Sequence, residues 1–109
     1  MWYLVLSRTL KRGEAKQPHY EAHRKWLETQ HREGRALFSG PSTDDTYGIY
    51  VLLAPNLEAA RKLAAQDPYH EQGDRELEQV LEWDPRRAMR MEGPTIAELE
   101  AMARGQSRG

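Results

Sequence analysis

Residues 47–53 constrain the fold most, because a strand there carries apolar side chains on both of its faces. Successive side chains of a strand point to opposite sides of the sheet. One face of this strand would carry Tyr47, Ile49, Val51 and Leu53, and the other face Tyr50 and Leu52. Residues 2–6 repeat the pattern, whereas a sheet with one face in water alternates apolar and polar residues. We therefore expect a sheet that is covered on both faces.

The other patterns complete the order strand, helix, strand, strand, helix, strand. Apolar and polar residues separate at helical spacing in two segments. One begins at Pro18 and stops before Gly34, and the other follows Asn56, which suits a helix N-cap, and runs to about Gln66. The predicted strands are residues 2–6, 35–39, 47–53 and 77–83.

This order predicts an α+β, ferredoxin-like βαββαβ sandwich, in which both helices cover one face of an antiparallel sheet. Two helices leave the second sheet face uncovered. Because that face is also apolar in residues 2–6 and 47–53, we predict that it packs against the same face of another copy. The expected assembly is a homodimer formed through the sheet faces.

The composition excludes several classes of protein. The 109 residues are enough for one domain with a modest core. A formal net charge of −1 and a single Phe argue against nucleic-acid binding, and the absence of Cys excludes disulfides and thiolate metal sites. The apolar runs are short and no basic leader precedes the first of them. We therefore expect a cytoplasmic protein that makes no contact with a membrane.

The pattern changes after Asp84, where we expect an appended helical segment at residues 85–105. Thr95 and Glu98 have the spacing of a capping box, and Gly105 suits the end of the helix. Ile96, Leu99 and Met102 would form its apolar stripe. The chain is thus divided into a ferredoxin-like domain at residues 1–84, this segment, and a disordered tail at residues 106–109.

His23 is the first candidate for chemistry, because it lies on the apolar side of the first predicted helix with Trp26 and Leu27. Its imidazole must point toward the core or a cleft beside it, and a buried imidazole needs a partner. One interpretation is a general acid or base in a partly desolvated pocket. The alternative is a core histidine that bonds to a backbone carbonyl.

Asp67 is the second candidate, because it follows the second predicted helix at the end where the helix dipole disfavours a carboxylate. The two helices of this fold lie side by side, so Asp67 could meet His23 and orient it. The alternative is a turn carboxylate, since Asp67 precedes Pro68. His19, His31 and His70 could join His23 as metal ligands. However, His19 and His23 form an isolated i, i+4 pair without the Glu-flanked pattern of metalloproteases, and the chain has no thiolates, so we predict no metal site.

The residues also carry a resemblance to a known family. His23 with Leu27, the run Ser39-Gly40-Pro41, the Ala-rich second helix and Asp67-Pro68-Tyr69 together resemble the YCII-related (YciI-like) proteins over residues 1–84. The resemblance implies a dimeric α+β barrel fold. It also implies an active site that pairs the helix histidine with the aspartate of the Asp-Pro-aromatic motif, which are His23 and Asp67 here.

By the same resemblance, Ser39, Gly40 and Pro41 would form part of a substrate-binding pocket wall, with Ser39 as a hydroxyl donor. Gly40 and Pro41 are alternatively a simple end to the strand. Tyr69 would line the same cleft or else be an ordinary half-buried aromatic residue. The activity implied for the group is lyase-like acid–base chemistry on small cyclic compounds.

These observations predict a homodimeric small-molecule enzyme, lyase- or hydrolase-like, in which His23 oriented by Asp67 transfers protons. No cofactor is predicted. One alternative is a non-catalytic small-molecule-binding or regulatory dimer that uses the same cleft. Another is a structural assembly in which both residues serve packing only.

Overall fold

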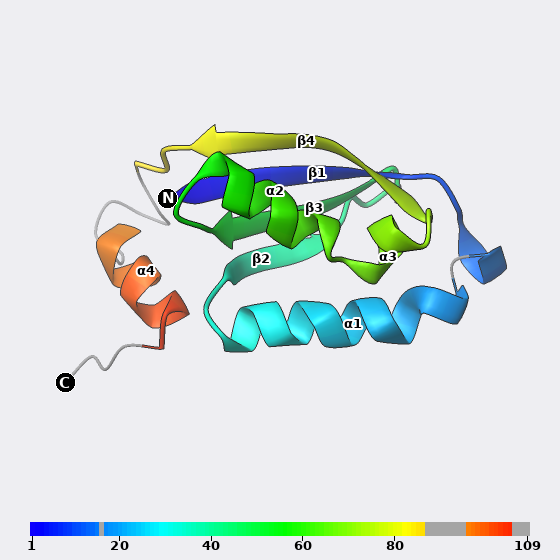
Figure 1. Ribbon diagram of the computed structural model, residues 1–109, viewed down its shortest axis with the longest axis horizontal. Helices are drawn as coiled ribbons and strands as arrows, with labels where there is room; N and C mark the ends of the chain where they lie inside the picture. The colour runs from blue at the N-terminus through cyan, green and yellow to red at the C-terminus, as the bar shows by residue number, and fades with distance from the viewer. Residues whose placement is uncertain (16, 87–95, 106–109) are drawn as a thin grey trace.

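The computed structural model describes residues 1–15, 17–86 and 96–105, which form a four-stranded antiparallel sheet and helices. The strands are β1 (Trp2–Thr9), β2 (Ala36–Pro41), β3 (Tyr47–Leu53) and β4 (Arg75–Trp83). The helices are α1 (Gln17–Arg32), α2 (Leu57–Ala65), α3 (Pro68–Glu71) and α4 (Ile96–Ala103), with a 3-10 turn η1 (Gly13–Ala15). The sheet order β2-β3-β1-β4 is that of the ferredoxin-like sandwich, which confirms the predicted fold class (Figure 1).

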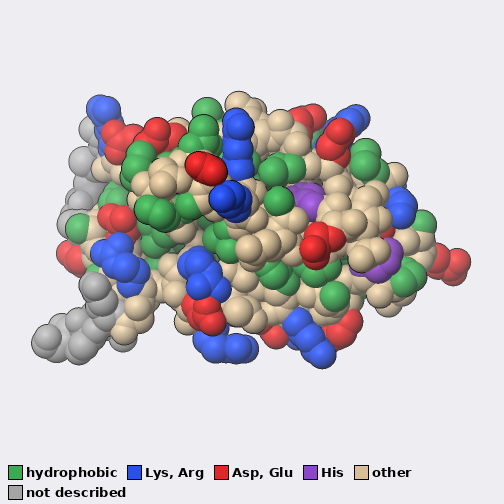
Figure 2. Space-filling view, in the orientation of Figure 1, with side chains coloured by type: hydrophobic (Ala, Val, Ile, Leu, Met, Phe, Trp, Pro, Cys, Tyr) green, Lys and Arg blue, Asp and Glu red, His purple; other side chains and the backbone are tan. Residues whose placement is uncertain are grey.

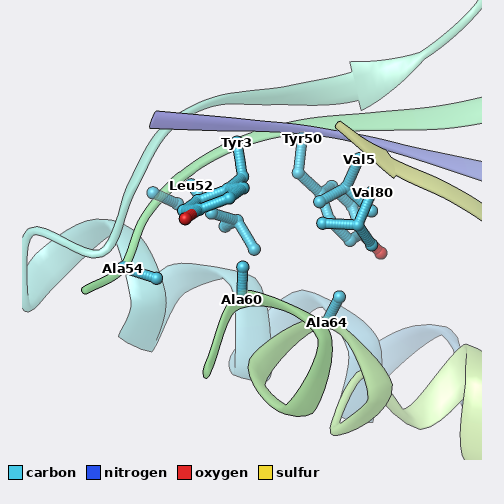
Figure 3. Close-up of a cluster of buried hydrophobic side chains, with 9 residues drawn as sticks. Tyr3, Val5, Tyr50, Leu52, Ala54, Ala60, Ala64 and Val80 are labelled. Atoms are coloured by element: carbon cyan, nitrogen blue, oxygen red, sulfur yellow. The ribbon is translucent and has the colours of Figure 1, made fainter. Parts of the chain in front are cut away.

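The core lies between one face of the sheet and the two long helices (Figure 3). From the sheet it contains Tyr3, Val5, Tyr50, Leu52 and Val80, which point toward α2. From the helices it contains Ala60 and Ala64 on α2, with Trp26 and Leu27 of α1 packed against it. Small alanines let α2 approach the sheet closely, so large aromatic side chains of the central strands fill the layer.

The opposite face of the sheet, which we call the open sheet face, is apolar as the sequence predicted. Strand register groups Leu4 with Val51 and Leu81, and Trp2 with Trp83. The apolar residues of the open sheet face are Trp2, Leu4, Leu6, Phe38, Ile49, Val51, Leu53, Leu81 and Trp83, and the polar Gln79, which pairs with Leu6, also lies on it. Three of these side chains are exposed in the single chain: Phe38 is 64% exposed, Leu81 48% and Trp83 45%.

The connection between α2 and β4 differs from the sequence prediction, which ended the second helix near Gln66 and began the last strand at residue 77. Pro68–Glu71 forms the short helix α3, and β4 begins at Arg75, earlier than predicted. Asp67 is the N-cap of α3 and accepts a hydrogen bond from the Tyr69 amide at 2.9 Å. Pro68 at the first helical position needs no hydrogen bond there, so Asp67-Pro68 starts a helix where a turn was expected.

The appended helix is present as α4, whose C-terminal end lies against the turn between α1 and β2. Gly34 in that turn has a φ of +76°, and a Cβ at this position would overlap the carbonyl oxygen of Ala103. Gly105 follows α4 with a φ of +72°, as expected of a C-terminal cap. Thr95 of the predicted capping box and the predicted tail at residues 106–109 lie outside the described residues. No helix in the described ranges has the length and apolarity needed to span a bilayer.

Replacing Gly34 with Ala should destabilise the fold more than replacing Gly73 with Ala. Both glycines have a positive φ, which costs an L-residue roughly 1–2 kcal/mol. Only Gly34 is also in contact with α4, because a Cβ at Gly73 meets nothing within 4 Å. We expect Gly73→Ala to lower Tm by about 4–8 °C for each kcal/mol of strain, and Gly34→Ala to lower it further. Equal decreases of Tm in the two variants would show that the contact between Gly34 and Ala103 adds nothing to the stability of the fold.

Candidate functional site

His23 lies on the buried side of α1, one turn before the residues that anchor this helix to the core. It is 8% exposed, and its Nδ1 lies 2.8 Å from Oδ1 of Asp67. The two residues are 44 positions apart in the chain. Packing of α1 against the sheet brings the imidazole to the N-terminus of α3, where Asp67 is the cap. The structure therefore brings the two sequence candidates into direct contact.

The Asp67 carboxylate is fully buried and holds the imidazole in one orientation. Its Oδ1 accepts hydrogen bonds from the Tyr69 amide at 2.9 Å and from His23. Because an ionised carboxylate only accepts, Nδ1 of His23 is the donating nitrogen and the ring's lone pair is at Nε2. Nε2 makes no hydrogen bond within the described part of the chain. The arrangement leaves one ring nitrogen for a proton-transfer role.

Tyr69 supports the imidazole from the side. Its ring is stacked on that of His23, with centroids 4.0 Å apart and an interplanar angle of 14°. The residue is 2% exposed, and burial raises the pKa of its phenol above the ordinary value. The phenol therefore stays protonated at neutral pH. Stacking and the Asp67 contact together restrict rotation of the His23 ring.

Two residues beside this group were not singled out by the sequence. Arg75, the first residue of β4, is 6% exposed, and its guanidinium carbon lies 4.9 Å from the centroid of the Tyr69 ring. Gly48 on β3 leaves the space for it, since a Cβ there would overlap the guanidinium. A glycine within an apolar strand is a sign of close approach and could have drawn attention to Gly48. No pattern in the neighbouring sequence predicts that Arg75 is buried beside this group.

A second histidine–aspartate pair lies one helical turn away on α1. Nδ1 of His19 is 2.5 Å from Oδ2 of the fully buried Asp74, and Nζ of Lys11 lies 3.6 Å from its Oδ1. From the sequence, His19 was a candidate only for metal binding. No cluster of three or more metal-binding side chains occurs within residues 1–15, 17–86 and 96–105.

His70 on α3 forms a separate contact with the sheet. Its Nδ1 donates to the carbonyl of Ala64 at 2.7 Å, and its Nε2 faces the hydroxyl of the buried Ser7. Because Nδ1 donates, Nε2 accepts a hydrogen bond from the Ser7 hydroxyl. Figure 2 shows histidine side chains reaching the surface beside α3, so this end of the sandwich combines imidazoles with buried polar groups.

The predicted pocket wall on β2 lies elsewhere. The Ser39 hydroxyl is 2.7 Å from Nε2 of His31, which is two turns beyond His23 on α1, or about 12 Å along the helix. Gly40 and Pro41 are exposed at the end of this edge strand. Of the predicted site residues, the structure thus brings together His23, Asp67 and Tyr69 and places Ser39 beside His31. A pocket-wall role for Ser39, Gly40 and Pro41 stays a prediction.

The fold and this buried pair define an α+β sandwich with a histidine–aspartate group beneath a short helix. Comparison with known proteins gives the family: the YCII-related domain matches residues 1–84, and the chain belongs to this family. The uncharacterized protein YjpA of Bacillus subtilis (strain 168) is 33% identical over 81 residues, which are 74% of this chain and 94% of YjpA.

The chain is also similar to a solved structure that shares its fold. That structure is 5-chloro-2-hydroxyhydroquinone dehydrochlorinase (TftG) from Burkholderia phenoliruptrix AC1100, in complex with 2,5-dihydroxybenzoquinone. The TM-score is 0.62 with 22% sequence identity, and the match covers 77% of this chain and 94% of TftG. At this identity the likeness establishes a common fold.

Proposed function

We propose that this protein is a small-molecule enzyme in which His23, oriented by Asp67, performs general acid–base chemistry on a small cyclic substrate. The observation that carries the proposal is the buried contact of 2.8 Å between Nδ1 of His23 and Oδ1 of Asp67. This distance lies within the reach of about 2.6–3.2 Å that such a pair requires. A fully buried carboxylate is costly unless it is bound to hydrogen-bond donors, and here it is bound to an imidazole whose other nitrogen has no partner in the described chain.

The proposed reaction is a lyase- or hydrolase-like step that begins with proton abstraction. In the elimination case, Nε2 of His23 takes a proton from an O–H or C–H bond of the substrate. The electron pair left behind forms a new double bond, and a leaving group departs with its bonding electrons. Asp67 stabilises the imidazolium by accepting its Nδ1 proton in a hydrogen bond, and His23 then releases the abstracted proton to water. The fold shared with TftG, a dehydrochlorinase, supports elimination as the first reaction to test.

A turnover screen with purified protein tests this proposal. Hydroxylated benzenes and quinones, each with and without a chloro substituent, would be followed by NMR and by chloride release. We expect at least one compound to be converted by the unaltered protein and to bind His23→Asn without conversion. Equal conversion by both proteins would refute the role of His23, and binding without conversion of any compound would favour a non-catalytic binding protein.

We also propose that the open sheet face joins two copies in a homodimer. All four strands contribute apolar side chains to this face, and Phe38, Leu81 and Trp83 are the most exposed of them. Two-fold association places the same patch of both copies in contact, so an apolar face is its own complement. The dimeric α+β barrel fold implied by the family resemblance supports a second copy as the partner.

A further inference from the structure

We propose that Arg75 binds an anionic oxygen of the substrate beside His23, so that the substrate of this site is a small cyclic oxyanion, either a carboxylate or an ionised ring hydroxyl. The inference rests on the proposed function and adds the chemical class of the substrate. It starts from a buried cation that has no negatively charged partner.

Arg75 is buried but not ion-paired. It is 6% exposed, and no carboxylate lies within 4.0 Å of its guanidinium nitrogens in the described part of the chain. Its Nε is buried without a hydrogen-bond partner there. Arginine stays protonated in proteins, and a buried charge is costly unless it is paired. This arginine therefore retains capacity to bind an anion.

Each nearby buried carboxylate already binds another group, although Oδ2 of Asp67 has no hydrogen-bond partner in the described part of the chain. Asp67 contacts His23 and the Tyr69 amide, and Asp74 contacts His19 and Lys11. On the strand that carries Arg75, the acidic side chains Glu76 and Glu78 pair with the exposed Arg8. The protein thus supplies carboxylate partners for its other cations near this end of the sheet and leaves Arg75 without one.

The position of the guanidinium is built into the sheet. Arg75 starts on the edge strand β4, and its side chain reaches across β1 to Gly48 on β3. A side chain at position 48 would overlap Nη1 of Arg75, so the guanidinium occupies space that only a glycine at this position leaves open. A surface arginine would extend into solvent, whereas this one is directed inward beneath α3.

Tyr69 links the guanidinium to the proposed base. Its ring contacts the His23 imidazole at 4.0 Å and the Arg75 guanidinium at 4.9 Å. The two groups are therefore no farther apart than these two distances together. Negative charge grows on a cyclic substrate when His23 removes a proton, and a preorganised cation nearby stabilises that charge.

Ligand titrations with three probes test the inference. They are 4-hydroxybenzoate, which carries a carboxylate, 2,5-dihydroxybenzoquinone, which carries an ionised ring hydroxyl, and neutral hydroquinone. We expect the protein to bind at least one anionic probe more tightly than hydroquinone, and Arg75→Met to weaken that binding about 10- to 100-fold with hydroquinone unchanged. The anion that binds more tightly identifies which of the two oxyanions the site takes. No preference for either anion, or a preference that survives Arg75→Met, would overturn the inference.

Three further variants separate binding from folding. Gly48→Ala should displace the Arg75 guanidinium from its position over residue 48 and cause the same loss of anion affinity. Arg8→Met, which removes an exposed arginine, should leave anion affinity unchanged. Without ligand, Arg75→Met should have a Tm at least as high as that of the unaltered protein. If Arg75 served a structural role instead, its replacement would lower Tm. His23→Asn should keep the preference for anions. If it keeps the preference and no compound is turned over by the unaltered protein, the proposed enzymatic function fails while Arg75 binding stands.

Discussion

Replacing His23 with Asn is expected to lower kcat by about 10²- to 10⁴-fold, the range that a positioned general acid or base contributes. Asn retains an amide that can donate to Asp67 in place of Nδ1, so the buried carboxylate keeps a partner. Substrate affinity and Tm should therefore change little compared with kcat. Steady-state kinetics on a converted compound, together with thermal unfolding, measure all three quantities.

Two companion variants show whether the effect belongs to this pair. Asp67→Asn should also reduce kcat, because the imidazolium loses its negative partner, while Asn still caps α3 and preserves the helix. His19→Asn removes the imidazole of the other histidine–aspartate pair, one turn away on α1, and should leave kcat nearly unchanged. If His19→Asn abolished turnover and His23→Asn did not, the reaction would have to be assigned to the pair with Asp74.

Replacing Leu81 with Glu is expected to convert the proposed homodimer into a monomer. Leu81 is 48% exposed in the single chain, so the fold tolerates a charge there. In a two-fold interface through the open sheet face the same change would bury two unpaired carboxylates. An uncompensated buried charge costs about 3–5 kcal/mol, which raises the dimer Kd by at least about 10²-fold. Analytical ultracentrifugation at micromolar concentration measures the outcome.

Leu57→Glu is the matched control, because Leu57 is also exposed but begins α2 on the other side of the sheet. This variant should sediment as the unaltered protein does. A monomeric unaltered protein at micromolar concentration, or a dimer that persists in Leu81→Glu, would contradict the proposed interface.

Local pattern was sufficient for most of the secondary structure. Strand β3 has the predicted bounds Tyr47–Leu53, and Asn56 caps α2 by accepting from the Ala59 amide at 2.8 Å. These features depend on neighbouring residues only. The short helix α3 was missed because four residues are too few to show a helical period, and Asp67-Pro68 is equally suited to a turn.

The candidate site was only partly visible in the sequence. His23 is a polar residue on an apolar helix face, and Asp67 is a carboxylate at the C-terminal end of a helix. Both are unusual for their immediate sequence surroundings, so the sequence alone could identify them. Arg75 obeys the rules of an exposed strand residue, so nothing in its neighbourhood predicts that it turns inward. The contacts of Ser39 with His31 and of His19 with Asp74 likewise join separate elements.

The amino-acid sequence by itself determined the order of strands and helices, the apolar character of both sheet faces, and the two residues of the proposed dyad. Each of these follows from periodicity or from a residue that conflicts with its immediate surroundings. Tertiary structure alone decided that Asp67 meets His23 at the start of α3, and that Arg75 lies over Gly48 against Tyr69. Those contacts depend on the docking of α1 and α3 on the sheet, which is set by packing between residues distant in the chain.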